Sequence, residues 1–102
     1  MATYRLTRDA RRDLSAIREF TKSRWGNEQS KKYILELRRL LTLLSDNPSM
    51  GIRRRDIDEG VYSFPHASHV IYYIIEKKYL IVIGVLHSSM APTNHLEGRT
   101  LV

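Results

Sequence analysis

Two long apolar runs, at residues 70–75 and 79–86, constrain the fold of this chain more than any other feature. Both are rich in β-branched and aromatic residues, and only the polar residues 76–78 separate them, which predicts a β-hairpin. Neither run has the strict alternation of apolar and polar residues that marks a strand with one solvent-exposed face. We therefore expect both faces of the hairpin to be covered, one by a helical layer and the other by something further.

The first half of the chain has the period of two amphipathic helices. Thr7 is the predicted N-cap of a helix over residues 8–25. A break at Gly26 separates it from the second helix, which is predicted to end at Asp46, shortly before Pro48. Because the connection is so short, the two helices are expected to run antiparallel. The predicted core positions are Ala10, Leu14, Ile17 and either Phe20 or Thr21 in the first helix, and Tyr33, Leu37, Leu40, Leu41 and Leu44 in the second.

The remaining segments are short. Residues 3–6 predict a strand at the edge of the sheet, and residues 49–59 predict a loop or irregular strand. Residues 88–102 are interpreted as a C-terminal tail, in which Thr93 caps a single helical turn that carries Leu96. The order is one strand, two helices and then three strands, and we expect a single domain over residues 1–102.

Composition narrows the class of protein. The chain has 17 Lys and Arg against 11 Asp and Glu, a formal charge of +6, which favours acidic partners or nucleic acid. Cysteine is absent, so a disulfide framework and a thiolate metal site are excluded, and a reducing compartment is acceptable. The N-terminus lacks an apolar signal core, and neither strand run is long enough for a membrane helix. We expect a cytoplasmic protein without membrane insertion.

A set of residues spread along the chain matches a known family in order and spacing. These residues are Ala10, Asp13, Leu14, Ile17, Trp25, Gly26, Tyr33, Leu37, Pro48, Gly51, Arg54, Gly60, Phe64, His69, Ile71, Tyr72, Val85, Leu86, His87, Met90, His95 and Leu96. On them the chain resembles the ParE toxins of type II toxin–antitoxin systems, within the RelE/ParE superfamily. The resemblance implies a compact α+β fold, in which a helical hairpin packs on a small twisted antiparallel sheet after an N-terminal strand. Among the matched residues it implies structural positions at Trp25, Gly26, Pro48, Gly51 and Gly60.

The resemblance also implies a function. A ParE-like toxin inhibits growth by binding DNA gyrase, stabilises plasmids, and is neutralised by a ParD-like antitoxin with which it forms a hetero-oligomer. It is therefore expected to be a binding protein and not an enzyme, with no cofactor. The chain departs from the family pattern at Tyr62 and Gly84, where many relatives carry arginine, and at Ala91, where many carry an acid.

The alternative is a ribosome-dependent mRNA endonuclease of the RelE kind, which needs a general base, a general acid and cations on the scissile phosphate. Such nucleases usually place arginine where this chain has Val70, and end their last strand near a tyrosine. Here Ser88, Ser89 and Met90 follow the strand, and the last tyrosine is Tyr79. We predict no catalytic residue. A third reading, a basic nucleic-acid-binding domain without toxicity, remains open.

Candidate partner-binding residues follow from charge, position and resemblance. They are Arg53, Arg54, Arg55, Tyr62, Tyr73, His87, Met90 and His95. Arg54 could equally pair with Asp56 or Glu59 to hold its loop. Two other residues have structural interpretations, His69 as a hydrogen-bonded residue at the start of a strand and Trp25 as a core or hinge anchor. The histidine spacing predicts no metal site.

The expected binding surface follows from the apolar hairpin. A two-helix layer covers one face of a sheet, so the opposite face and the groove beside the helices remain available to a partner. An acidic, amphipathic antitoxin segment that folds on docking is the predicted occupant.

Overall fold

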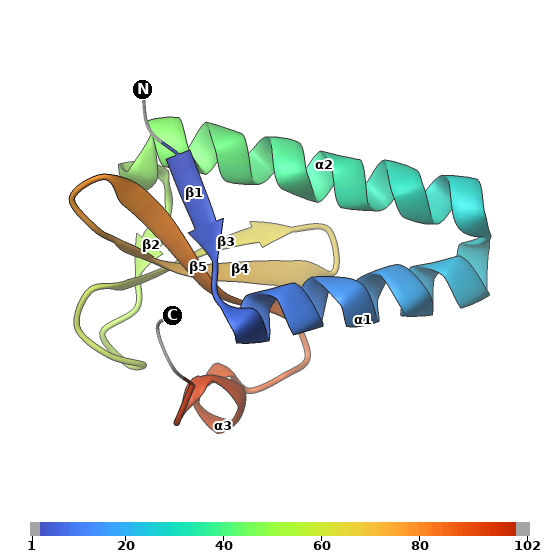
Figure 1. Cartoon of the computed structure of the whole chain (residues 1–102). Coiled ribbons are helices and arrows are strands. Elements are labelled where there is room, and N and C mark those ends of the chain that lie inside the picture. The colour runs from blue at the N-terminus through green and yellow to red at the C-terminus, as the bar shows by residue number, and fades with distance from the viewer. Residues whose placement is uncertain (1–2, 100–102) are drawn as a thin grey trace.

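The computed structural model describes residues 3–99 and shows an α+β fold, as predicted (Figure 1). The elements in chain order are β1 (Thr3–Leu6), α1 (Arg8–Trp25), α2 (Asn27–Asp46), the 3₁₀ turn η1 (Pro48–Met50), β2 (Ile52–Arg53), β3 (Val61–His66), β4 (His69–Ile75), β5 (Tyr79–His87) and α3 (Pro92–Leu96). The long helices α1 and α2 form an antiparallel hairpin on one side of the sheet (Figure 1). The short helix α3 lies on the other side.

The sheet has the strand order β1-β5-β4-β3-β2. The predicted hairpin is confirmed: β4 and β5 pair antiparallel from the His69 and His87 end to Ile75 and Leu80. The predicted edge strand is also confirmed, but β1 pairs with β5 in parallel. The sheet is therefore mixed and not wholly antiparallel, because no tight turn joins these two strands and so none imposes the antiparallel direction.

The helical hairpin is built from the signals that predicted it. Thr7 caps α1 by accepting a hydrogen bond from the Ala10 N–H at 3.1 Å, and Gly26 ends α1 with φ +90°. Thr21, and not Phe20, faces inward: its hydroxyl lies 2.7 Å from the Ser30 hydroxyl, which joins the two helices. Phe20 is 57% exposed.

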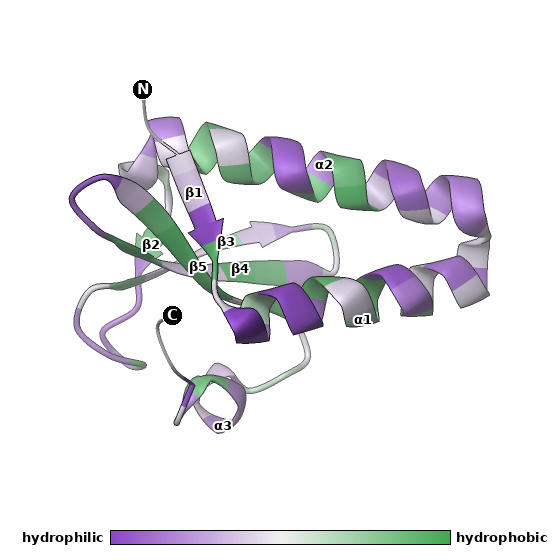
Figure 2. Ribbon diagram, in the orientation of Figure 1, coloured by the Kyte–Doolittle hydropathy of each residue, from purple (hydrophilic) through white to green (hydrophobic). Residues whose placement is uncertain are grey.

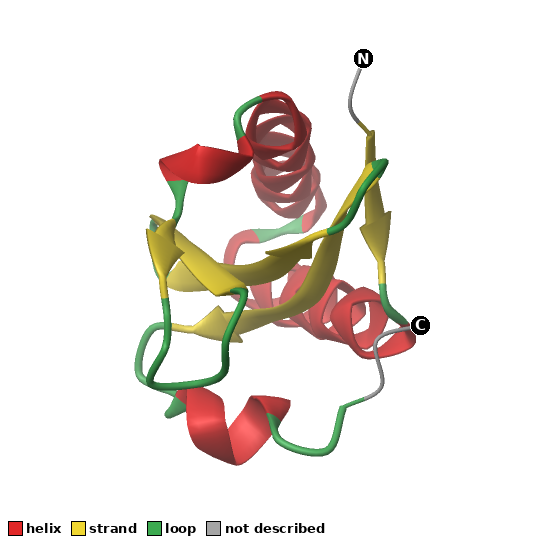
Figure 3. Cartoon of the chain, turned by 90° about the vertical axis from the view of Figure 1, so that its left-hand side faces the viewer, coloured by secondary structure: helices red, strands yellow, loops and turns green. Residues whose placement is uncertain are grey.

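Both faces of the sheet carry apolar cover, but α3 supplies part of it on the face that was expected to remain available to a partner. The core between the sheet and the helical hairpin includes Leu37, Leu41, Ile71, Tyr73 and Val82. A second cluster on the opposite face joins the sheet to the buried Leu96 of α3. Figure 2 shows the apolar strands and the polar turn between β4 and β5. In Figure 3, α2 lies above the strands and α3 below them.

Two expectations are corrected by this arrangement. The segment interpreted as a tail contributes to the second core through the predicted helical turn, and Ala91 occupies the N-cap position that Thr93 was expected to take. Trp25 is not a core anchor, since it is 53% exposed. It lies at the end of the helical hairpin that projects beyond the sheet (Figure 1), and its ring meets the ring of Tyr33 edge-on at 6.1 Å.

Candidate functional site

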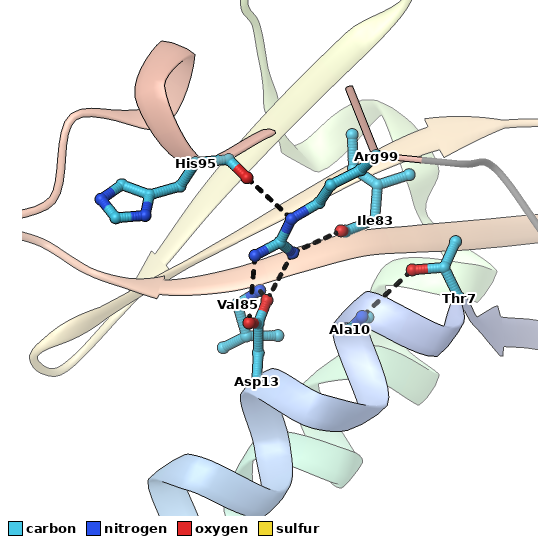
Figure 4. Close-up of polar contacts among 7 residues, drawn as sticks. All are labelled: Thr7, Ala10, Asp13, Ile83, Val85, His95 and Arg99. Atoms are coloured by element: carbon cyan, nitrogen blue, oxygen red, sulfur yellow. Dashed lines mark hydrogen bonds and ion pairs between the residues drawn. The ribbon is translucent and has the colours of Figure 1, made fainter. Parts of the chain in front are cut away.

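An ion pair between Asp13 of α1 and Arg99 connects the C-terminal segment to α1 and to the sheet (Figure 4). Arg99 Nη1 donates to Asp13 Oδ2 at 2.7 Å and Nη2 to Oδ1 at 3.2 Å. Arg99 also donates to the carbonyls of Ile83 at 3.0 Å and His95 at 2.8 Å, and the Val85 N–H donates to Asp13 Oδ2 at 3.0 Å. Both charged side chains are 16% exposed. We call this arrangement the Asp13–Arg99 clasp.

The clasp gives a physical reason for glycine at position 84. A Cβ atom there would lie 2.7 Å from the Leu96 side chain and 3.0 Å from Arg99 Nη1. Glycine therefore lets the C-terminal segment lie directly on β5. Gly84 departs from the family pattern in the sequence, but the role of Arg99 could not be predicted, because no local signal links residues 86 positions apart.

A groove of about 720 Å³ opens on the outer face of the sheet, beside the clasp. Its floor includes Val61, Ile74 and Ile83, and its walls are the loop before β3 and the segment from Leu96 to Arg99. Four acidic residues line it, and we call it the acidic groove. They are Asp58, Glu59, Glu76 and Glu97.

A second groove, of about 360 Å³, lies along the helical hairpin. Three cations line it, Arg18, Lys31 and Arg38, and so does the half-exposed Leu35. We call it the basic groove. It combines positive charge with apolar surface, which is the chemistry that an acidic amphipathic segment requires.

The arginine run 53–55 does not present one patch of three charges. Arg53 and Arg55 are exposed, but Arg54 turns inward and holds Asp56 through two hydrogen bonds of 3.0 Å. This hydrogen-bonded pair raises the pKa of Arg54 and lowers the pKa of Asp56. Arg54 also donates to the Ser63 hydroxyl at 3.2 Å. The alternative interpretation of Arg54, as the residue that fixes its own loop, matches this geometry.

Tyr73 corrects the predicted list of partner-binding residues. Its side chain is completely buried, and its hydroxyl accepts from the Gly51 N–H at 3.0 Å and donates to the Pro48 carbonyl at 2.7 Å. A side chain in this position has no surface to offer a partner. Its burial raises the pKa of the Tyr73 hydroxyl. Tyr62 is half-buried and stacks on Tyr73, with ring centroids 5.5 Å apart.

The remaining predicted partner-binding residues lie apart from the arginine run. His87, Met90 and His95 are exposed, from the end of β5 to α3. Arg53 pairs with Tyr62, near the start of β3, whereas His87 lies at the end of the sheet where β3 turns into β4. The structure therefore separates the arginine run from the three C-terminal residues. Of the remaining structural positions, Gly26 and Gly60 have positive φ, Pro48 begins η1, and Gly51 passes against Tyr73.

Imidazole rings gather at one end of the sheet, beneath the helical hairpin. The Tyr33 hydroxyl lies 2.7 Å from His69 Nδ1, and the rings of His66 and His87 lie near these two. His69 is thus a hydrogen-bonded structural residue, as expected. Burial lowers the pKa of His69 below its usual 6.5, and the charges of His87 and His66 lower it further.

We expect the stability of the fold to depend on pH through His69. A neutral buried imidazole contributes stability above the unfolded pKa of about 6.5, and this stability is lost as pH falls through the depressed folded-state pKa. The groups that face the ring are Tyr33 of α2, His66 at the end of β3 and His87 at the end of β5. The Glu36 carboxylate of α2 lies 3.8 Å from His66 Nε2. Urea unfolding between about pH 8 and pH 5 measures the slope.

Two variants test whether His69 is the residue responsible for this pH dependence of stability. His69→Gln should flatten the slope below about pH 6.5, whereas His95→Gln, at an exposed position of α3, should leave it unchanged. Equal slopes in both variants would contradict the assignment to His69.

Within residues 3–99, no group of three or more His, Cys, Asp or Glu side chains is arranged to hold a metal ion. In the same part of the chain, no helix has the length and apolar character to cross a membrane.

Residues 4–92 match the family described as the ParE toxin of the type II toxin–antitoxin system, parDE. The chain is 34% identical over 96 residues to Toxin ParE1 of Caulobacter vibrioides, covering 94% of this chain and 99% of that protein. It is 31% identical over 88 residues to Toxin ParE1 of Mycobacterium tuberculosis, covering 85% and 90%.

A solved structure has the same fold. It is described as the chromosomal ParDE TA system from P. aeruginosa and superimposes with a TM-score of 0.74 at 19% identity. The match covers 85% of this chain and 96% of that one.

Proposed function

The chain belongs to the ParE family of toxins from type II toxin–antitoxin systems, and from this premise we propose that it inhibits DNA gyrase by protein–protein binding and is neutralised by a ParD-like antitoxin. The observation that carries the proposal is the family match over residues 4–92, which covers the helical hairpin and every strand of the sheet apart from Thr3. The toxin would meet both partners in the cytoplasm. With the antitoxin it would form a hetero-oligomer. Toxicity then requires binding and no chemical step.

The basic groove supports the antitoxin part of the proposal. Arg18, Lys31 and Arg38 offer positive charge to an acidic segment, and Leu35 offers an apolar anchor between them. The acidic segment was expected on the face of the sheet opposite the helices or in the groove beside the helices. On the opposite face it would meet four carboxylates. Like charges across an interface are repulsive, so the helical hairpin is the better position for it.

Purified gyrase tests the target. The toxin should inhibit supercoiling and cause cleaved DNA to accumulate, and added ParD-like protein should reverse both effects. Primer extension on mRNA from induced cells provides the contrast, because a RelE-like nuclease predicts cuts at the ribosomal A site with gyrase unaffected. That second outcome would overturn the gyrase proposal in favour of the nuclease.

Charge reversal tests the docking position of the antitoxin. The double variant Lys31→Glu and Arg38→Glu should weaken binding of a ParD-like protein by roughly tenfold or more at low salt, because both cations would become repulsive. The control variant, Lys77→Glu and Lys78→Glu, makes the same change of charge in the exposed turn between β4 and β5. Calorimetric titration measures both, and a larger loss in the control would place the antitoxin elsewhere.

A further inference from the structure

The acidic groove is a negative site in a basic protein, and the proposed function makes no use of it. The chain carries a formal charge of +6, yet four of its 11 acidic residues line this one groove. They come from three separate segments, Asp58 and Glu59 before β3, Glu76 after β4, and Glu97 after α3. The negative character of the groove is therefore made by the fold and not by a run of acids in the chain.

The acids are not neutralised by nearby cations. All four are exposed, and none of them is in an ion pair within the described residues. Arg99 also lines the groove, but its guanidinium is held by Asp13, so its charge is already compensated. An occupant of the groove would experience a net negative field from its rim.

The floor of the groove is apolar. Val61, Ile74 and Ile83 form its base, and Ile75, which is 43% exposed, extends the apolar surface to one end. The volume of about 720 Å³ is within the range of concave ligand-binding sites in proteins. The Asp13–Arg99 clasp holds the wall at Leu96 to Arg99 in place, so the groove exists without a partner.

We propose that the acidic groove is the docking site for a basic amphipathic segment of a partner protein, with apolar side chains on the floor and Lys or Arg against the rim. The charge of the rim selects this occupant, since an acidic segment would be repelled there. Helix α3 and the helical hairpin pack on opposite faces of the sheet, so the protein can hold a basic segment here and an acidic segment on the basic groove at once. This inference does not depend on gyrase being the target.

A labelled peptide tests the proposal directly. The probe is an amphipathic peptide of about 12 residues made of leucine and lysine at helical spacing, compared with its leucine and glutamate counterpart. Fluorescence anisotropy should show saturable binding of the lysine peptide at about 10–100 μM, weakened by added salt, and no binding of the glutamate peptide. Equal binding of the two peptides, or binding of neither, would overturn the proposal.

Neutral variants locate the binding on the protein. The triple variant Glu59→Gln, Glu76→Gln and Glu97→Gln should reduce affinity for the lysine peptide about tenfold, because three attractive charges are lost. The matched control is Glu19→Gln, Glu28→Gln and Asp46→Asn, three exposed acids on the helical hairpin. Circular dichroism checks that both variants are folded. If the control lost as much affinity as the triple variant, the peptide would be binding by net charge and the site would be refuted.

A second copy of this chain is the competing occupant, because its basic groove has the complementary charge. Sedimentation of the free protein distinguishes the two cases. A monomer that binds the lysine peptide supports a separate partner. Self-association that the triple variant abolishes would assign the acidic groove to the chain itself and overturn the proposal.

Discussion

Asp13→Ala is expected to lower the free energy of unfolding by about 3 kcal/mol, which is a large fraction of the stability of a domain of this size. The substitution leaves the guanidinium of Arg99 without its carboxylate in a position where it is only 16% exposed, and removes the acceptor for the Val85 N–H. Both groups then stay shielded from water without a hydrogen-bond partner, so the free energy of desolvating them is no longer offset. Thermal unfolding should show a midpoint lower by roughly 10–20 °C.

An exposed ion pair provides the control. Asp56→Ala breaks the pair with Arg54, but Asp56 is 62% exposed, so water replaces much of the interaction. Its cost should be far smaller than that of Asp13→Ala, because water screens an exposed pair. If the two substitutions had equal effects, the clasp would be an ordinary surface pair. Because the clasp holds one wall of the acidic groove, Asp13→Ala should also weaken binding of the lysine peptide, measured below the unfolding transition.

Tyr73→Ala is expected to cost about 3–5 kcal/mol, because it removes the largest fully buried side chain among the described residues. Tyr73→Phe keeps the ring and removes only the hydroxyl. It should still cost about 1–3 kcal/mol, since the Gly51 N–H and the Pro48 carbonyl lose their partner. Urea unfolding measures both variants.

Tyr62→Phe is the matched control for the hydroxyl. It removes the same atom from the half-buried ring that stacks on Tyr73, and no hydrogen bond of the Tyr62 hydroxyl is seen within the described residues. The change should be close to neutral, within about 0.5 kcal/mol. A Tyr73→Phe variant of unchanged stability would contradict the structural role. If its stability fell while antitoxin binding held, Tyr73 would be a core residue and not a contact.

Local signals were sufficient for the secondary structure. The apolar runs predicted β4 and β5 within a residue or so, and Thr7, Gly26 and Pro48 marked the helix boundaries, because caps and breakers act on the backbone within a few residues. The same signals could not tell which of two neighbouring helical residues would point into the core. Phe20 and Thr21 were equivalent by period, and the small Thr21 faces inward because it meets Ser30 at the close crossing of the helices.

The candidate sites were less predictable. Apolar density identified the strands but not that Tyr73 would be completely buried, so Tyr73 was mistaken for a surface residue. Arg53, Arg54 and Arg55 look alike in the chain, and only the position of Asp56 and Ser63 turns the middle one inward. Trp25 was predicted as a core or hinge anchor because it lies where the helices turn, but at that end of the helical hairpin its side chain is 53% exposed.

The amino-acid sequence by itself determined the elements, their order and the demand for cover on both faces of the sheet, because hydrophobic period and capping are properties of neighbouring residues. The tertiary structure alone decided which charges meet. Asp13 and Arg99 become partners, and Asp58, Glu76 and Glu97 come to line one groove, only when the strand order brings distant segments together. Electrostatic interactions depend on distance and burial, and both are set by the folded arrangement of the whole chain.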